Sequence, residues 1–470
     1  MPAERGGAAL SGFFALELGI RGLRAQLIAS QVIGHNIANS RTPGYSRQVA
    51  DLRPPPDLRF TALGRTLTMG TGVTVTGIRR QREEFLDRLS RWHGTDLRRL
   101  ETVQHSLDLV EMSFAEPAGF GPRQAVLRLW DGFHELAANP ESGPVRSAVR
   151  EEARALAANL SGLATRLEGQ RTEHARTAAD VVAEINQMAE QIAGLNRQIR
   201  MATLQQTEAN DLEDRRDLLL DSLAGLVGAV SRRELDDSVT VSVAGSDIVQ
   251  GDVALPLSSD VAGGVLRVLD SLGSPLSPTG GEMAGLIDLH NVRIPEYINL
   301  LDGFARQMAD ALNAVHRTGH GLDGSTGLDL YRYDPAAPAR TLTLAPEVTA
   351  SPLALAASAG GEPGDGEGAL ALARVLTDPT FGGQGAAEFW ASAIGALGLE
   401  VESVTREVDN TRILARQAEN RRAEVMGVNL DEETVHLLRS QHAYAAAARL
   451  ISTADEMLDT LINRTGRVGR

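Results

Sequence analysis

The sequence contains neither cysteine nor lysine, and each absence removes whole classes of chemistry. Without cysteine the chain has no disulfide framework, no thiolate nucleophile and no cysteine-bound metal. Without lysine it has no Walker A phosphate site, no Schiff base and no Ser-x-x-Lys catalysis. Aromatic residues are also few, at 4%, while alanine is abundant, which favours long packed helices over thick β-sandwiches.

Long apolar runs and positive charge are scarce as well. No apolar run approaches the roughly 20 residues that cross a membrane, and the N-terminus lacks the pattern of a secretory signal peptide. The formal net charge is -15, whereas phosphate binding needs a basic surface. We therefore expect no membrane insertion and no nucleic-acid partner.

The sequence does contain a repeated helical pattern, with apolar residues at spacings of three and four. The predicted helical segments are residues 13–37, 100–114, 145–201, 282–315 and 386–426, with a terminal helix that starts at Asn429 or Asp431. Residues 49–78 are expected to be extended, residues 229–281 to form strands, and residues 341–344 to form one more strand. The fold class is therefore mainly α with a β insertion. We expect an elongated multidomain chain with paired terminal helices, a long helical-bundle rod domain and a small β domain.

This pattern divides the chain into five segments. Residues 1–55 hold the N-terminal helix and residues 428–470 the C-terminal helix, and together they form an inner terminal domain. Residues 56–228 and 282–427 are the two parts of the helical rod domain, the second with an irregular segment at 318–380, and residues 229–281 are the inserted β domain.

One stretch organises the chain, because the N-terminal helix ends within it and an extended run begins. Residues 36–47 read Asn-Ile-Ala-Asn-Ser-Arg-Thr-Pro-Gly-Tyr-Ser-Arg. Pro43 forces Thr42 out of the α region, and Gly44 accepts a positive φ, so the helix cannot continue through this stretch. We expect Gly44 to have a positive φ in the turn that redirects the chain.

Three patterns that could indicate chemistry have simpler interpretations. Residues 210–221 alternate charges beside an apolar face, which we interpret as a solvated helix face with i,i+4 ion pairs. Residues 319–324 match G-x-G-x-x-G, but they follow a helix, whereas a dinucleotide site follows a strand. The acidic residues 431–433 suit the dipole of the helix that they begin. The sequence predicts no enzyme, no cofactor and no metal site.

Two motifs resemble those of a known family. Residues Asn36, Ala38, Asn39, Thr42, Gly44 and Tyr45 read as the N-x-A-N-x-x-T-x-G-Y box of bacterial flagellar axial proteins. Near the C-terminus, residues 427–433, 441–444 and 451–458 resemble the hook-associated protein 1 family within that group. The resemblance implies a structural subunit that connects the flagellar hook to the filament by self-assembly through its terminal helices. The alternatives are a rod or hook axial subunit or, from a different class, an exported cell-wall hydrolase or adhesin.

The resemblance also implies partners and a location. The partners are hook protein, the next hook-filament junction protein, further copies of the chain in a ring, and a cytoplasmic flagellar export chaperone. The chain would be extracellular, at the hook-filament junction, after type III export from the cytoplasm. Within such an assembly we expect that residues 231–279 can be replaced by a short Gly-Ser link without loss of export or assembly.

The predicted assembly interface combines the apolar stripes of the two terminal helices with the two family motifs. Its residues are Leu16, Ile20, Leu23, Leu27, Asn36, Asn39, Thr42, Pro43, Gly44, Tyr45, Asn429, Leu430, Leu437, Tyr444, Ile451, Leu458 and Leu461. The chaperone is predicted to bind Leu437, Tyr444, Ile451, Leu458 and Leu461. Gly19, Gly22 and Gly34 each weaken the N-terminal helix by roughly 0.5–1 kcal/mol, so we expect the ends to order only between neighbouring subunits.

Overall fold

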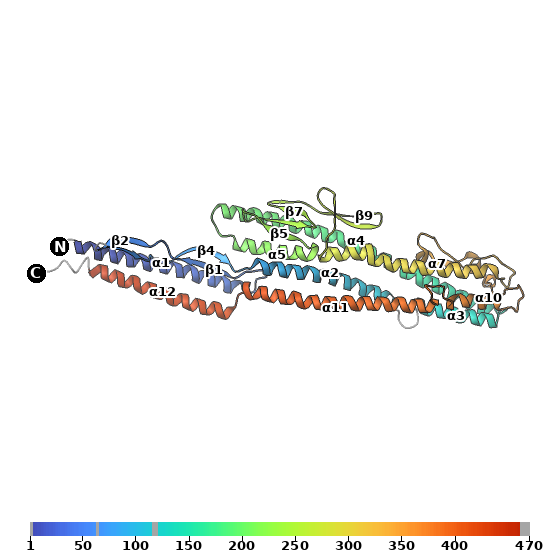
Figure 1. Ribbon diagram of the computed structural model, residues 1–470. Coiled ribbons are helices and arrows are strands. Elements are labelled where there is room, and N and C mark those ends of the chain that lie inside the picture. Colours follow the sequence, from blue (N-terminus) through green and yellow to red (C-terminus); the bar gives the residue numbers. More distant parts are fainter. Residues whose placement is uncertain (1–2, 63–64, 115–120, 461–470) are drawn as a thin grey trace.

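The computed structural model describes residues 3–62, 65–114 and 121–460, and it shows an elongated molecule built mainly from long helices (Figure 1). At one end, α1 (Ala3–Asn39) runs antiparallel to α12 (Leu430–Asp459), and the two helices are in contact along their length. The mainly α fold class and the paired terminal helices are therefore confirmed. Leu461, which was predicted to belong to the interface, lies outside the described residues.

Small side chains form the contact between α1 and α12. A Cβ atom built on Gly19 would lie 2.6 Å from Cγ1 of Ile451, so only glycine allows this approach. Further along, the hydroxyl oxygens of Ser30 and Ser440 are 2.9 Å apart. Gly19 weakens α1 locally, but its missing side chain also lets the second helix come close.

A two-stranded ribbon covers another side of α1. Strand β1 (Gln48–Arg53) pairs antiparallel with β4 (Thr74–Arg80), and both strands contact α1. Between them lies the hairpin of β2 (Leu58–Ala62) and β3 (Arg65–Met69). The ribbon thus returns the chain from the terminal pair to the start of the rod.

The rod is made of helices that carry the predicted spacing. It contains α2 (Glu84–Phe114), α3 (Pro122–Ala138), α4 (Gly143–Leu204), α5 (Asn210–Val227), α6 (Gly281–Asp288), a π-helical turn (Leu289–Arg293), α7 (Ile294–Thr318) and α11 (Ala386–Met426). The predicted seam of α2 is buried from Leu100 to Phe114, and α2 packs along α11. Regular helical spacing is a local property, so it predicted α4, α7, α11 and the second half of α2, whereas α3 was not predicted.

Seven strands lie between α5 and α6, and they share a hydrophobic core with the helices. They are β5 (Val230–Arg233), β6 (Val239–Val243), β7 (Ser246–Gln250), β8 (Val253–Ala254), β9 (Ser258–Ala262), β10 (Val265–Leu269) and β11 (Pro275–Leu276), in two antiparallel sheets ordered β5-β6-β7-β8 and β11-β10-β9. Val241, Ile248 and Leu266 belong to the same buried cluster as Ile185 and Ile192 of α4. The insertion is therefore packed onto α4 rather than suspended beside it.

The segment between α7 and α11 is more ordered than the sequence predicted. It contains β12 (Tyr331–Arg332), α8 (Pro338–Thr341), β13 (Thr343–Leu344), α9 (Pro346–Ala350), a 3₁₀ turn (Pro352–Ala354) and α10 (Glu367–Thr377). The strand predicted at 341–344 was wrong at its start, because Thr341 ends α8. Helix α10 was missed because the glycines at 360–368 indicated a linker, yet Leu372 and Leu376 are buried against the rod.

Candidate functional site

The residues of the N-terminal motif meet the start of α12 and the charged helix α5 in a polar joint that is largely buried, although the side chain of Asp211 is 59% exposed. We define the polar joint as Asn36, Tyr45, Ser46, Arg47, Gln48, Arg80, Arg82, Asp211, Glu213, Asp214, Asp217 and Glu433. These residues come from the last turn of α1, from β1 and β4 with their flanking loops, from α5 and from the first turn of α12.

Asn36 stands at the centre of one half of the joint, and 1% of its surface is exposed. Its Nδ2 donates to the backbone oxygen of Gln48 at 2.9 Å and to Oε2 of Glu433 at 3.0 Å. Its Oδ1 accepts the hydroxyl of Tyr45 at 2.8 Å and the backbone N–H of Gln48 at 2.9 Å. This one amide therefore ties α1 to β1 and to α12.

Glu433 is the partner that the sequence analysis missed. We had attributed its charge to the helix dipole, but Glu433 is buried and its Oε1 accepts Nε of Arg47 at 2.7 Å. The backbone N–H of Arg47 donates to the carbonyl of Met426, at the end of α11, at 2.8 Å. Arg47 and Glu433 thus fix the bend between α11 and α12, where Asn429 caps α12 by accepting the backbone N–H of Asp431.

The turn after α1 has the geometry that its sequence predicted. The backbone N–H of Thr42 donates to the carbonyl of Asn39 at 2.9 Å, and its hydroxyl donates to Oδ1 of Asn39 at 3.1 Å. Gly44 has a φ of 76°, as expected, and a Cβ atom there would lie 3.3 Å from Cβ of Leu218 on α5. The turn therefore packs against α5 at Gly44.

Replacing Gly44 by valine is expected to lower the free energy of unfolding by about 1–3 kcal/mol, because a β-branched residue is strained at positive φ. Gly34→Ala is the matched control, since Gly34 lies inside α1 with no atom near its would-be Cβ. That change should leave stability unaltered or raise it by up to about 1 kcal/mol. Equal effects of the two substitutions in urea unfolding would contradict the role of the turn.

Helix α5 does not present the solvated face that its alternating charges predicted. Asp214 is buried, and its carboxylate accepts the backbone N–H of Ser46 at 2.9 Å and the Ser46 hydroxyl at 2.7 Å. Asp211 accepts Nε2 of Gln48 at 2.9 Å. Arg216, only 2% exposed, donates to the backbone oxygen of Asp237. The prediction was wrong because the partners of these charges lie far away in the sequence.

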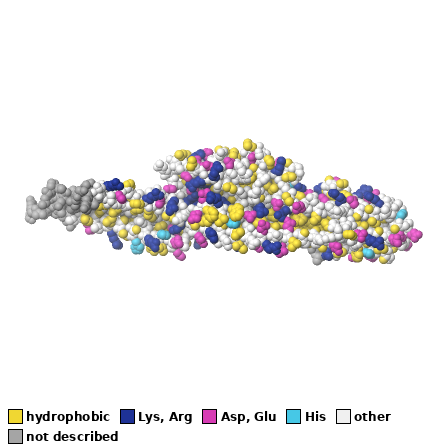
Figure 2. Space-filling model, viewed as in Figure 1, with side chains coloured by type: hydrophobic (Ala, Val, Ile, Leu, Met, Phe, Trp, Pro, Cys, Tyr) yellow, Lys and Arg dark blue, Asp and Glu magenta, His cyan; other side chains and the backbone are white. Residues whose placement is uncertain are grey.

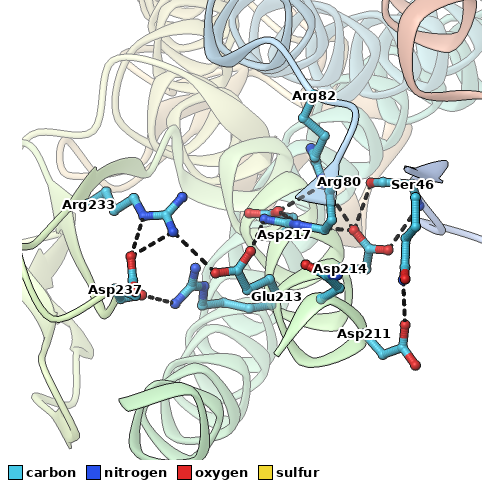
Figure 3. Close-up of polar contacts among 12 residues, drawn as sticks. Ser46, Arg80, Arg82, Asp211, Glu213, Asp214, Asp217, Arg233 and Asp237 are labelled. Atoms are coloured by element: carbon cyan, nitrogen blue, oxygen red, sulfur yellow. Dashed lines mark hydrogen bonds and ion pairs between the residues drawn. The ribbon is translucent and has the colours of Figure 1, made fainter. Parts of the chain in front are cut away.

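Arginines from β4 and the loop after it complete the other half of the joint. Arg80 extends between the carboxylates of α5, with terminal nitrogens 2.6 Å from Glu213, 2.7 Å from Asp214 and 2.7 Å from Asp217 (Figure 3). Arg82 contacts the same Oδ2 of Asp217 at 2.8 Å. Burial alone would raise the pKa of Asp217, but the charges of Arg82 and Arg80 outweigh it and hold this pKa below its ordinary value.

The ionic contacts continue from the joint into the rod. Arg82 also reaches Asp87 of α2 at 2.8 Å, and Arg422 of α11 lies 2.9 Å from Asp87 and 2.6 Å from Asp221 of α5. Three rod helices are therefore connected to the ribbon that leads to the terminal pair. Among the described residues no group of histidine, aspartate and glutamate side chains is suited to hold a metal ion.

The joint is expected to lose stability in acid. Because the pKa of Asp217 in the fold lies below its ordinary 3.8, the folded state binds fewer protons, and the stabilisation present above pH 3.8 is lost as pH falls below it. At pH 7 an Asp217→Asn variant should therefore be less stable than the parent by roughly 2 kcal/mol. Denaturant titrations should show this difference shrinking below pH 3.8, and a difference independent of pH would refute the assignment.

The predicted apolar stripe of α1 lies beside the α1–α12 contact, whereas Ile451 of the α12 stripe lies in that contact, against Gly19. Leu16, Ile20 and Leu23 are half-buried and Leu27 is exposed, about 100° around α1 from the residues that touch α12. On α12, Leu458 is buried, while Tyr444 and Leu430 are exposed. Leu437 and Ile451 are half-buried, and Pro43 lies exposed on the turn.

The exposed apolar residues of α12 were only partly predicted. Leu438, Leu450 and Met457 are exposed and were not named, because each lies one position away from the spacing of residues 437, 444, 451 and 458. In Figure 2 hydrophobic side chains lie among charges of both signs, on the described part of the terminal helices and over the middle of the molecule alike. None of the helices in the described part of the chain is long and apolar enough to cross a membrane.

Comparison with known families gives two matches along the chain. Residues 107–331 match the model of the helical domain of flagellar hook-associated protein FlgK, and residues 420–464 match the C-terminal model of the flagellar basal body rod proteins FlgEFG. The first covers most of the rod with the β insertion, and the second covers α12 and its approach. A rod helical domain and an axial-type C-terminus therefore occur in one chain.

Comparison with whole proteins also gives flagellar hook-associated proteins. Flagellar hook-associated protein 1 of Bacillus subtilis is 29% identical over 516 aligned residues, which cover 98% of this chain and all of that protein. Its namesake in Salmonella typhimurium is 26% identical over 323 residues, covering 66% of this chain and 58% of that protein. The structure of the flagellar hook junction protein FlgK from Burkholderia pseudomallei shares the fold, with a TM-score of 0.64 over 71% of this chain and 99% of that one, at 15% identity.

The paired terminal helices, the turn motif and the helical rod define an axial structural protein of the bacterial flagellum. Within that class the chain is similar along nearly its whole length to hook-associated protein 1, a structural protein of the hook-filament junction.

Proposed function

We propose that the chain assembles through the outer faces of α1 and α12, in a ring of identical subunits that adapts the hook to the filament. The observation that carries this proposal is the division of the terminal pair into two surfaces. Its inner contact is closed by small residues such as Gly19 and Ser440, while Leu27, Leu450 and Met457 remain exposed. Exposed apolar side chains on a helix pair of this kind suit contact with neighbouring subunits.

The polar joint gives this assembly a defined geometry. Because Asn36 and Arg47 both bond to the buried Glu433, and the backbone of Arg47 bonds to Met426, the terminal pair is held at a fixed bend relative to α11. Arg80 and Arg82 then connect the ribbon to α5 and α2. In our proposal the rod domain is positioned around the ring by this joint, with hook protein on one side and the next junction protein on the other.

The family relationship also suggests the route by which the chain reaches its place. We propose that a cytoplasmic export chaperone covers Leu437, Tyr444, Ile451, Leu458 and Leu461 before type III export, and that the protein is extracellular afterwards. The ends would be poorly ordered in the free chain and would order between neighbours. The domain division proposed from the sequence places residues 1–55 and 428–470 in the assembling part and residues 56–427 in the rod and its insertion.

Substituting Leu450 and Met457 together by aspartate tests the assembly surface. These residues are seven positions apart and so share one face of α12, and each aspartate would carry an unpaired charge into an apolar contact. We expect the double variant to melt like the parent but to be absent from the hook tip in immunogold labelling, with filament subunits shed into the medium.

The matched control is Ile451→Asp with Leu458→Asp, which alters the face that touches α1. In the assembled protein this pair should lower the protection of α1 against hydrogen exchange, because it disturbs the contact between the terminal helices. Normal incorporation of the Leu450 and Met457 variant would show that the outer face of α12 is not an assembly surface.

A further inference from the structure

A small pocket lies near the end of the rod that is remote from the terminal helices, where α7 ends and α10 begins (Figure 1). Its volume is about 90 Å³, and it is bordered by the glycine-containing loops at 320–324 and 358–363 and by the start of α4. The first loop belongs to the G-x-G-x-x-G stretch, residues 319–324, which does not qualify as a dinucleotide site because it follows a helix. Nucleotide-sized ligands occupy pockets of roughly 300–1,000 Å³, so this pocket excludes them on size.

The pocket is lined by a buried arginine that no carboxylate contacts directly. Arg146 is 1% exposed, and its Nε donates to the backbone oxygen of Pro140 at 2.8 Å and its Nη1 to that of Leu355 at 2.5 Å. Among the described residues its Nη2 has no hydrogen-bond partner, and no carboxylate oxygen lies within ion-pair distance. Burial lowers the pKa of Arg146, which the more distant charge of Asp323 only partly offsets. The guanidinium therefore has donor capacity that the protein itself does not use.

A second polar atom in the pocket wall is also unused. The Nδ1 of His320 is buried and has no hydrogen-bond partner within the described part of the chain. Its position is fixed, because the His320 backbone bonds to Ser358 on the facing loop and its ring packs on Gly361, whose φ is +88°. Gly321 leaves no room for a side chain, since a Cβ there would lie 2.5 Å from the hydroxyl of Ser325. The two loops therefore hold the His320 ring in place, and the Arg146 side chain lines the same pocket.

We propose that this pocket binds one small oxyanion, of the size of a carboxylate or a phosphate, through Nη2 of Arg146 and Nδ1 of His320. A guanidinium with a free terminal N–H is a strong donor to such groups. Glu362 lies at the pocket wall and Asp323 lies nearby, so ligands of low charge are favoured over highly charged ones.

Isothermal titration of the full chain with sodium acetate and, separately, with sodium phosphate tests the proposal, with sodium chloride holding the ionic strength constant. We expect saturable binding of at least one of the two anions, with one site per chain. Which anion binds more tightly distinguishes a carboxylate source from a phosphate source. Absence of saturable binding for both anions would overturn the proposal.

Three variants connect the binding to the pocket. Arg146→Gln should weaken binding roughly tenfold or more, whereas Arg154→Gln, on the exposed face of the same helix, should not change it. Because Arg146 also holds Pro140 and Leu355, its variant could fail to fold, so Glu362→Gln provides a separate test. The Glu362 side chain has no bonds among the described residues, and removing its charge should tighten binding several-fold. Unchanged affinity in Glu362→Gln would place any bound anion elsewhere and refute the site.

Discussion

Replacing Arg80 by alanine is expected to destabilise the chain by roughly 3–5 kcal/mol, the usual effect of removing one partner from a buried ion network. The Arg80 side chain is 10% exposed and contacts the carboxylates of Glu213, Asp214 and Asp217. Without it, these carboxylates would face one another with little water to screen them. The loss should be greater than for a solvent-exposed pair, which contributes about 0–1 kcal/mol.

Arg53→Ala supplies the matched control for this prediction. Arg53 lies on the neighbouring strand β1 and pairs with Asp51, but its side chain is 69% exposed. Urea unfolding of both variants should show a large shift for Arg80 and almost none for Arg53. Hydrogen exchange should locate the loss in β4 and α5 first, because these elements carry the network. Equal stability of the two variants would mean that the joint holds the rod less firmly than its contacts indicate.

Replacing residues 231–279 by a short Gly-Ser link is expected to destabilise the middle of the rod, on the order of 5 kcal/mol or more. The sequence alone favoured a removable insertion, but the structure changes this expectation. Val241, Ile248 and Leu266 cover Ile185 and Ile192 of α4 in one buried cluster. The amide of Asn196, also on α4, bonds to both the backbone N–H and the carbonyl of Val239.

Circular dichroism melts and limited proteolysis of the shortened chain would measure this effect. Leu235→Ser is the control, because Leu235 lies in the same segment and is fully exposed. It should melt like the parent, whereas the shortened chain should become sensitive to protease along α4. An unchanged melt of the shortened chain would restore the interpretation of the strands as a surface decoration.

The long helices and the turn could be predicted because their signals are local. Spacing of apolar residues defined α2, α4 and α11, and Pro43 with Gly44 defined the turn, all within a few residues of the feature concerned. Helix α10 was hidden for the same reason, since the glycines before it gave a local signal for a linker. Features of this kind can be predicted from one sequence because the residues that determine them are close together in the chain.

The polar joint could not be predicted because its contacts are long-range. Asn36 and Glu433 are 397 positions apart, and Arg80 and Asp214 are 134 apart. The sequence of a charged helix has the same pattern whether its side chains contact water or arginines from another element. The one available signal was complementary charge, since residues 79–82 contain three arginines and residues 211–217 four acidic side chains.

The amide of Asn36 has a consequence for the chemical ageing of the protein. Spontaneous hydrolysis of that amide would exchange Nδ2 for an oxygen while changing the size of the side chain very little. The new carboxylate would then face the carbonyl of Gln48 and the carboxylate of Glu433, two acceptors where a donor had stood. Because the site is almost closed to water, the like charges could be relieved only by taking up a proton or by separating α1 from α12. Damage to one atom would therefore open the terminal pair at its base.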